Sequence, residues 1–129
     1  MSVLLHAPQS VGDVLDRLTI LEIKRARFPE GAARDNVLRE IAALEAGWRD
    51  AGLPEDVPER ADLAAVNLTL WEVEDRLRLR EAAGDFGADF VEDARSVYRV
   101  NDRRAALKRA VNDRFGSALR EEKLHPRYG

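Results

Sequence analysis

Residues 89–115 read as one long helix whose apolar stripe is interrupted by polar side chains. At about 100° per residue, the apolar members of this stripe are Phe90, Ala94, Val97, Ala105 and Phe115. Asn101, Lys108 and Asn112 lie within roughly 20° of its centre by the same arithmetic. A buried polar group without a hydrogen-bond partner costs about 1–3 kcal/mol. The stripe therefore predicts either a buried polar network or the floor of a binding site.

The periodicity along the rest of the chain predicts an all-α protein. We expect four main helices, over about 11–27, 35–51, 58–83 and 89–115. Ser10 is the expected N-cap of the first helix. A short extended lead-in precedes it, Gly116 breaks the last helix before a restart over 117–123, and the tail from 124 onward is irregular. Phe86, in the turn before the last helix, is expected to plug the end of the bundle.

Length and composition bound the class of protein. A chain of 129 residues with 45% apolar and 35% charged side chains fits one folded domain spanning 1–129 and argues against disorder. No apolar run approaches the roughly 20 residues that span a bilayer, so no membrane insertion is expected. The first residues carry no secretory signal. A cytoplasmic protein of bacterial type is the default expectation.

Several kinds of chemical site are not predicted. The chain has no cysteine, and His6 and His125 have no partner at metal-ligand spacing, so we expect no metal site. Glu72 and Asp75 form only one acidic pair, whereas magnesium-dependent nucleotide pyrophosphohydrolases use paired acidic lines on facing helices. No glycine-rich phosphate loop is present, and no cofactor is expected. The arginines between 95 and 109 spread around their helix, so nucleic acid is not an expected partner.

The first helix has two apolar faces. Its core face contains Leu15 and Leu18, and Trp48 continues the apolar stripe of the second helix, so deep burial is expected for Trp48. Ile20 and Ile23 lie on the other face of the first helix, together with Asp16. This second face indicates either a homodimer contact or packing within the bundle.

The third helix carries a polar line beside its apolar stripe. This line consists of Asn67, Trp71, Glu74, Arg78 and Glu81, and Trp71 is expected to be half-buried at its border. An antiparallel arrangement of the third and fourth helices would bring the line towards Asn101 and Lys108. Lys108 is then expected to pair with Glu74 or Glu81. Such a pair either fixes the register of the helices or forms part of a site.

Charge composition draws attention to the lysines. The chain contains 18 arginines but only Lys24, Lys108 and Lys123, and a lysine supplies a compact charge on a flexible stem. Residues 89–129 carry a net charge of +3, whereas the whole chain carries −3. This asymmetry indicates either complementarity between the two parts or an anion site on the last helix.

Four segments together resemble a bacterial family of small proteins described as a domain of unknown function. They are SVGDVLDRLTILEIK at 10–24, VNLTLWEVEDRLRLRE at 66–81, ARSVYRVNDRRAALKRAVN at 94–112 and EEK at 121–123. The most specific parts are Leu-Trp-x-x-Glu-Asp at 70–75 and Ala-Arg-x-Val-Tyr-x-x-Asn-Asp at 94–102. The resemblance covers about Ser10 to Tyr128. It names no reaction, but it draws attention to its matching residues, among them Arg95 and Tyr98.

Three functional interpretations remain open. The first is a non-enzymatic binding or assembly module, working as a homodimer, whose polar seam between helices three and four recognises a partner or small ligand. The second is a small enzyme acting on an anionic molecule, with Glu74 or Glu81 as acid/base and Lys108, Arg78 or Arg95 as anion clamps. The third is a purely structural subunit, which mutual saturation of the polar side chains would favour. The candidate ligand-binding residues are Asn67, Trp71, Glu74, Arg78, Glu81, Arg95, Tyr98, Asn101, Lys108 and Asn112.

Overall fold

A computed structural model describes residues 2–128, and it is all-α. The helices are α1 (Val11–Arg27), α2 (Ala32–Asp50), α3 (Glu59–Ala83) and α4 (Ala88–Phe115), and the described part contains no strand. The predicted four-helix architecture, with a non-helical lead-in and an irregular tail, is therefore confirmed. None of the helices within 2–128 combines the length and apolar character needed to cross a membrane.

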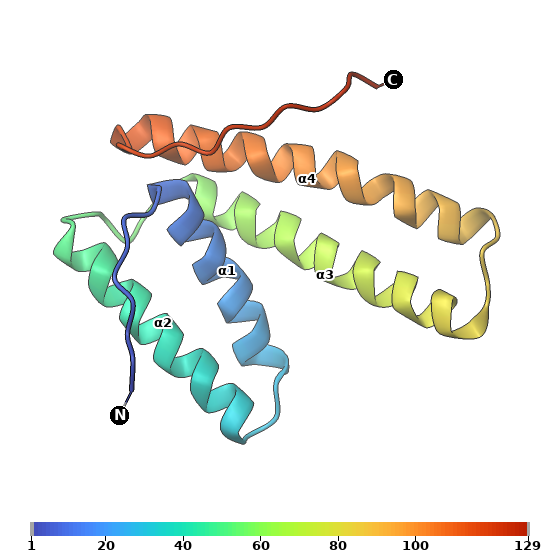
Figure 1. Cartoon of the computed structure of the whole chain (residues 1–129), viewed down its shortest axis with the longest axis horizontal. Coiled ribbons are helices and arrows are strands. Elements are labelled where there is room, and N and C mark those ends of the chain that lie inside the picture. The colour runs from blue at the N-terminus through green and yellow to red at the C-terminus, as the bar shows by residue number, and fades with distance from the viewer. Residues whose placement is uncertain (1, 129) are drawn as a thin grey trace.

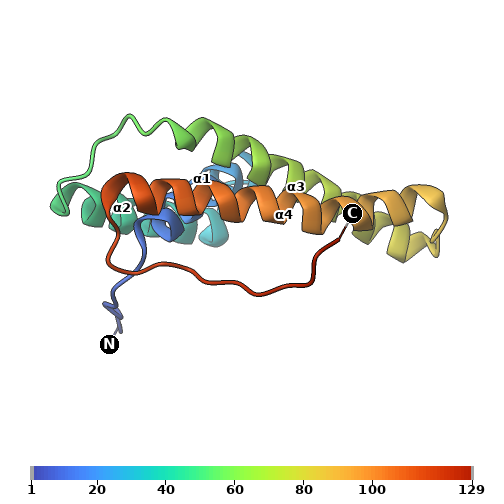
Figure 2. The ribbon, with the colours of Figure 1, turned by 90° about the horizontal axis from the view of Figure 1, so that it is seen from above.

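The helices are arranged around α1, which packs against each of the other three (Figure 1). The helices α3 and α4 form a long antiparallel hairpin, and the end of this hairpin near its turn extends past α1 and α2 (Figure 1). The tail after α4 turns back and runs alongside that helix (Figure 2). A helix with neighbours on three sides must bury side chains on more than one face, and this requirement positions the polar residues of α1 described below.

Local signals in the sequence account for the ends of the helices. The Ser10 side chain accepts a hydrogen bond from the Asp13 N–H at 3.1 Å, which confirms it as the N-cap of α1. Gly84 and Gly116 end α3 and α4 with φ of 68° and 59°, a left-handed conformation that glycine adopts without strain. The chain does not return to helix after Gly116, so the predicted restart over 117–123 is wrong.

The apolar core consists of two clusters. One joins Leu15, Leu63 and Val111 with Trp48 and Val57, and the other joins Leu18 and Leu21 of α1 with the buried residues of α2. Full burial of one such aliphatic side chain contributes about 1.5–3 kcal/mol. These clusters hold α1 between α2 and the α3–α4 hairpin.

The two tryptophans occupy the environments that the sequence predicts. Trp48 is buried, donates its indole N–H to the Pro54 carbonyl at 2.8 Å and packs edge-on against Phe115. Trp71 is half-buried, with the guanidinium of Arg27 6.0 Å from its ring centre. Both predictions are confirmed.

Phe86 does not plug the bundle. Its side chain is exposed, and its ring packs edge-on against that of Phe90, with 5.2 Å between the ring centres. The hairpin tip lies beyond the ends of α1 and α2 (Figure 1), so no open end of the core is within its reach. The prediction failed because it assumed four helices of matched extent.

Candidate functional site: a polar seam between α1, α4 and the tail

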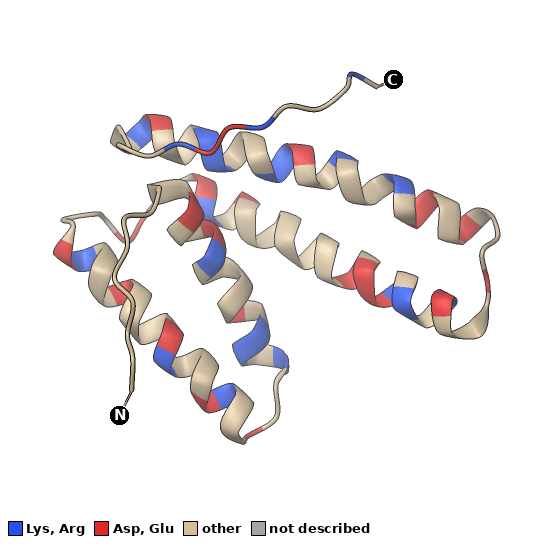
Figure 3. Ribbon diagram, in the orientation of Figure 1, with Lys and Arg blue, Asp and Glu red and all other residues tan. Residues whose placement is uncertain are grey.

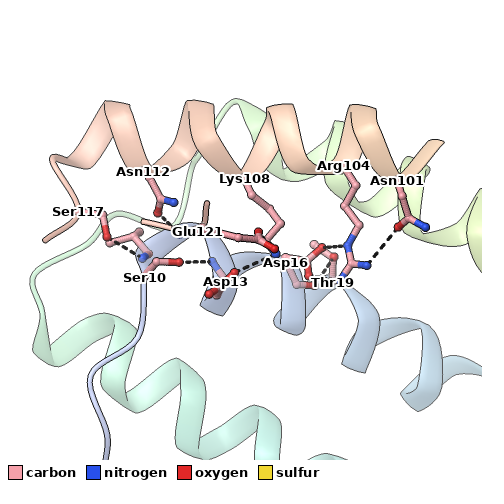
Figure 4. Close-up of polar contacts among 12 residues, drawn as sticks. Ser10, Asp13, Asp16, Thr19, Asn101, Arg104, Lys108, Asn112, Ser117 and Glu121 are labelled. Carbon is pink, nitrogen blue, oxygen red and sulfur yellow. Dashed lines mark hydrogen bonds and ion pairs between the residues drawn. The ribbon is translucent and has the colours of Figure 1, made fainter. Parts of the chain in front are cut away.

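The polar residues of α4 face α1 rather than the polar line of α3. We call the resulting network the polar seam (Figure 4). Its members are Ser10, Asp13, Asp16, Thr19, Asn67, Asn101, Arg104, Lys108, Asn112, Ser117 and Glu121. The seam runs along the crossing of the two helices, with α3 contributing Asn67 and the tail contributing its last two members. The expected location between helices three and four was therefore wrong.

Asp16 is the most deeply placed carboxylate of the seam, with 4% of its surface exposed. Arg104 donates two hydrogen bonds to it, from Nη2 to Oδ2 at 2.6 Å and from Nε to Oδ1 at 2.8 Å. Asn67 donates a third, at 2.9 Å, and its Nδ2 also contacts the Thr19 hydroxyl oxygen. Bidentate charge-assisted bonds of this kind fix geometry as well as charge. They join α1, α3 and α4 at one point.

Protonation of Asp16 reflects two opposing effects. Burial raises the pKa of its carboxyl group, but the hydrogen bonds from Arg104 and Asn67 outweigh burial and hold the pKa below 3.8. The pKa of Arg104 is raised, chiefly because it donates to Asp16. The pair is therefore fully ionised at neutral pH.

Lys108 lies one turn further along α4, and two carboxylates bind it. Its Nζ is 2.9 Å from Asp13 Oδ1 and 2.7 Å from Glu121 Oε2, and only 11% of its side chain is exposed. Burial lowers the pKa of Lys108, but these two partners more than compensate and raise it above 10.5. Lys108 therefore carries a full charge and connects α4 to both α1 and the tail.

At the end of the seam the backbones of α1 and α4 almost touch. Asn112 Oδ1 accepts the Gly12 N–H at 2.6 Å, and Ser117 Oγ accepts the Val11 N–H at 3.1 Å. A Cβ atom on Gly12 would lie 2.4 Å from the Lys108 carbonyl oxygen. Only glycine allows this approach, and the two side chains satisfy N–H groups that the first turn of a helix leaves without a partner.

The interior of the seam is saturated. Across residues 2–128, every fully buried side-chain nitrogen or oxygen has a hydrogen-bond partner. No group of three or more histidine, aspartate or glutamate side chains within that range is placed to hold a metal ion. The buried part of the seam therefore fixes the angle and position at which α1 crosses the α3–α4 hairpin, a role that buried ion pairs often have.

The structure brings together only some of the residues predicted to form a site. Asn67, Asn101, Lys108 and Asn112 belong to the seam, with Asn101 accepting a 3.5 Å hydrogen bond from Arg104. The remaining predicted residues lie outside the seam. Four of them are exposed: Glu74, Arg78, Glu81 and Arg95. The guanidinium of Arg27 lies over the ring of Trp71, and Tyr98 packs edge-on against Tyr128 of the tail.

The predicted pairing of Lys108 with Glu74 or Glu81 is wrong because of the register of the hairpin. Arg76 of α3 binds Asp93 of α4 at 3.1 Å near the turn, and Glu59 binds Arg114 at the other end. In this register Lys108 lies near the N-terminal end of α3, many residues away from both glutamates.

The partners of the predicted residues were missed in the sequence. The sequence places Asp16 on the second face of the first helix, with Ile20 and Ile23, but predicts no hydrogen-bond partner for it. It predicts neither Asp13 nor Glu121 as a partner of Lys108. One signal was available, since Gly12, Asp16 and Thr19 follow one another at spacings of four and three. That spacing places them on one side of a helix.

Comparisons with known proteins give a family but no further relatives. No match was found among curated proteins or among solved structures. The model of a family of unknown function, DUF6165, matches residues 5–126. This match covers almost the whole chain, and the protein therefore belongs to the DUF6165 family.

Proposed function

We propose that this chain is a non-enzymatic assembly module that pairs with a second copy of itself through a groove between α1 and α3. The observation that carries the proposal is an apolar hollow of about 420 Å³ that residues of α1 and α3 line. The side chains that line it are Thr19, Glu22, Ile23, Ala26, Arg27, Ala64, Ala65 and Leu68. We call this hollow the α1–α3 groove.

The composition of the α1–α3 groove favours a protein surface as its occupant. The segment of α3 from Leu63 to Trp71 contains no charged residue (Figure 3), in a chain with 35% charged side chains. Leu68 is 38% exposed and lies beside Ala64 and Ala65, which leave room for another side chain. Contiguous exposed apolar surface of this kind marks interaction sites.

Self-complementarity favours a second copy over an unrelated partner. A two-fold contact requires one surface to carry both the projecting group and the space that receives it. Here Leu68 projects and the alanines provide space, so each copy's Leu68 would enter the other's groove. Leu79 lies on the same face of α3, within about 20° of Leu68, and is largely exposed. The charged Glu72 and Asp75 separate it from the groove, so it forms a second apolar contact point rather than part of the hollow.

The ends of the groove have the polarity of an interface rim. An ion pair between Glu22 and Arg60 closes one end, and Arg27 reaches Glu72 at 3.5 Å at the other. Apolar centres surrounded by polar rims are typical of protein interfaces. This surface contains Ile23, which the sequence suggests for a dimer contact, whereas the half-buried Ile20 does not line it.

The enzymatic alternative receives no geometric support. Glu74 and Glu81 are exposed, and Lys108 is bound to Asp13 and Glu121 instead. We therefore do not extend the proposal to catalysis by these residues.

Light scattering coupled to size-exclusion chromatography tests the proposal. We expect the wild type to elute at twice the chain mass of 14.5 kDa, and Leu68→Glu and Ile23→Glu to elute as monomers with unchanged helical circular dichroism. Val91→Glu is the matched control, because Val91 is 50% exposed on α4 outside the groove. A wild type that is monomeric at high micromolar concentration would refute the proposal, as would a folded Leu68→Glu that stays dimeric.

A further inference from the structure

A second, smaller hollow lies where the tail crosses α4, separate from the α1–α3 groove. It is lined by Ala105, Lys108, Arg109, Asn112, Glu121 and Lys123. Three of these side chains are cations, and Glu121 is the single anion among them. We call it the Lys108 hollow. With the tail in place it has room for about 10 Å³, less than the volume of one additional carboxylate, so Glu121 fills it.

Asn112 adds an uncharged donor to the Lys108 hollow. Its residue is 2% exposed, and its Oδ1 is fixed by the Gly12 N–H at 2.6 Å. That bond orients the amide, so that Nδ2 is the group left over. Within residues 2–128 this Nδ2 donates no hydrogen bond, and because every fully buried side-chain nitrogen there has a partner, Nδ2 is reached by solvent. Asn112 lines the hollow, so an acceptor that enters the hollow can receive this free donor.

The tail that delivers Glu121 is held by few and exposed contacts. Residues 118–128 are all exposed. Besides the Glu121–Lys108 pair, their attachments are polar or aromatic: Arg120 to Asp113, His125 and Tyr128 to Asp102, and the edge of Tyr128 against Tyr98. Segments with little buried apolar surface open at low free-energy cost. Glu121 can therefore leave Lys108 without disturbing the core.

We propose that the Lys108 hollow binds a phosphate group, for which the Glu121 carboxylate stands in when the tail is closed. Once the tail leaves with Glu121 and Lys123, Lys108 and Arg109 face the hollow and Asp13 remains on the far side of Lys108. Two positive charges less one negative charge leave one, which matches a phosphate monoanion. Its oxygens would accept hydrogen bonds from the two cations and from Asn112, and charge-assisted bonds of this kind are the strong ones.

The proposal links ligand binding to release of the tail. Phosphate and Glu121 compete for the same donors. The apparent affinity for phosphate is therefore the intrinsic affinity multiplied by the fraction of molecules in which the tail is open. Removing the charge of Glu121 without changing its size should therefore tighten phosphate binding. Binding should in turn free residues 121–128 from α4.

Calorimetric titration with inorganic phosphate at constant ionic strength tests both statements. We expect Glu121→Gln to bind phosphate about tenfold more tightly than the wild type, and Glu121→Gln carrying Arg109→Gln to lose at least that gain. Arg109 is exposed, so both variants keep the fold. In the wild type, phosphate should lower the heteronuclear NOE of the amides of residues 121–128.

The controls separate a built site from general attraction of charge. Arg103→Gln removes one exposed arginine of α4 outside the hollow and should change phosphate affinity less than twofold, whereas Arg109→Gln alone should weaken it several-fold. The proposal is overturned if Glu121→Gln shows no saturable phosphate binding, or if the two arginine variants weaken binding equally. Acetate that binds as tightly as phosphate would overturn the assignment of the ligand class.

Discussion

Replacing Gly12 by alanine tests whether the close approach of α1 and α4 organises the fold. A Cβ at this position would lie 2.4 Å from the Lys108 carbonyl oxygen and 3.0 Å from Asn112 Oδ1, where ordinary contacts begin at 3.4 Å. The obstructing oxygen belongs to helical backbone, so no side-chain rotation relieves the clash. The helix α1 must withdraw by about 1 Å at this point.

The expected loss of stability combines three contributions. Overpacking of a tightly packed contact costs about 1–3 kcal/mol. Withdrawal of α1 also weakens the 2.6 Å bond from the Gly12 N–H to Asn112, and a buried polar group that loses its partner costs about 1–3 kcal/mol. Alanine regains up to about 1 kcal/mol of helix propensity. We therefore expect Gly12→Ala to lower the free energy of unfolding by roughly 2–4 kcal/mol.

Gly47→Ala is the matched control. Gly47 lies in the interior of α2, and a Cβ there meets nothing within 4 Å, so this change should stabilise the protein by about 0.5–1 kcal/mol. Urea unfolding followed by tryptophan fluorescence measures both variants. The Gly12→Ala midpoint should fall by on the order of 1–2 M for a protein of this size, and the Gly47→Ala midpoint should rise. A Gly12→Ala protein as stable as the wild type would refute the reasoning.

Two further predictions concern charge and packing. Burial raises the pKa of Asp16, but Arg104 and Asn67 bind the ionised carboxylate and lower the pKa overall. The ionised Asp16 therefore stabilises the folded protein above about pH 4, and this stabilisation is lost as the pH falls through the lower pKa of the folded state. The stability difference between wild type and Asp16→Asn should accordingly shrink in urea titrations from about pH 6 to pH 3, and a difference independent of pH would contradict this account. Trp48→Ala should cost about 3–5 kcal/mol in the same assay, and iodide should quench Trp71 more than Trp48; equal quenching would contradict their placement.

The fold was predictable because each helix carries a strong local signal. Apolar spacing, the Ser10 cap and the glycines at 84 and 116 locate the helices with errors of a few residues, the largest being a start of α2 at Ala32 rather than near 35. The relative extent of the helices was not available from these signals. Periodicity shows which face is apolar but not how far a neighbour covers it, and for this reason Phe86 was misplaced.

The seam was half predictable. Asn101, Lys108 and Asn112 were found because polar residues in an apolar stripe must bind something, and that inference depends on α4 alone. Their partners depend on where α4 meets the other helices. The short turn between α3 and α4 already fixes an antiparallel register that places Lys108 far from Glu74 and Glu81, so this part of the error was avoidable.

The contribution of α1 was less accessible, because its sequence fits two arrangements. Leucines on one face suggest a helix covered on that face only, and Asp16 then lies outward. A helix covered from three sides gives the same leucine pattern, with Asp16 turned into the hairpin. The two arrangements differ in whether Asp16 meets a cation on a neighbouring helix, and the half-buried Arg104 of α4 is that cation. Pairings of this kind arise from tertiary contacts and leave no periodic signal.

The saturated seam also determines which parts of the molecule remain available for binding. By fixing α1 across the hairpin through Asp16 and Gly12, it sets the width of the α1–α3 groove on one side. On the other side of α4, the seam leaves Lys108 paired with Glu121, a residue of the exposed tail. The proposed self-association and the proposed phosphate binding therefore involve separate surfaces. Leu68→Glu should leave phosphate affinity unchanged, and Glu121→Gln should leave the dimer intact, so that each proposal can fail without the other.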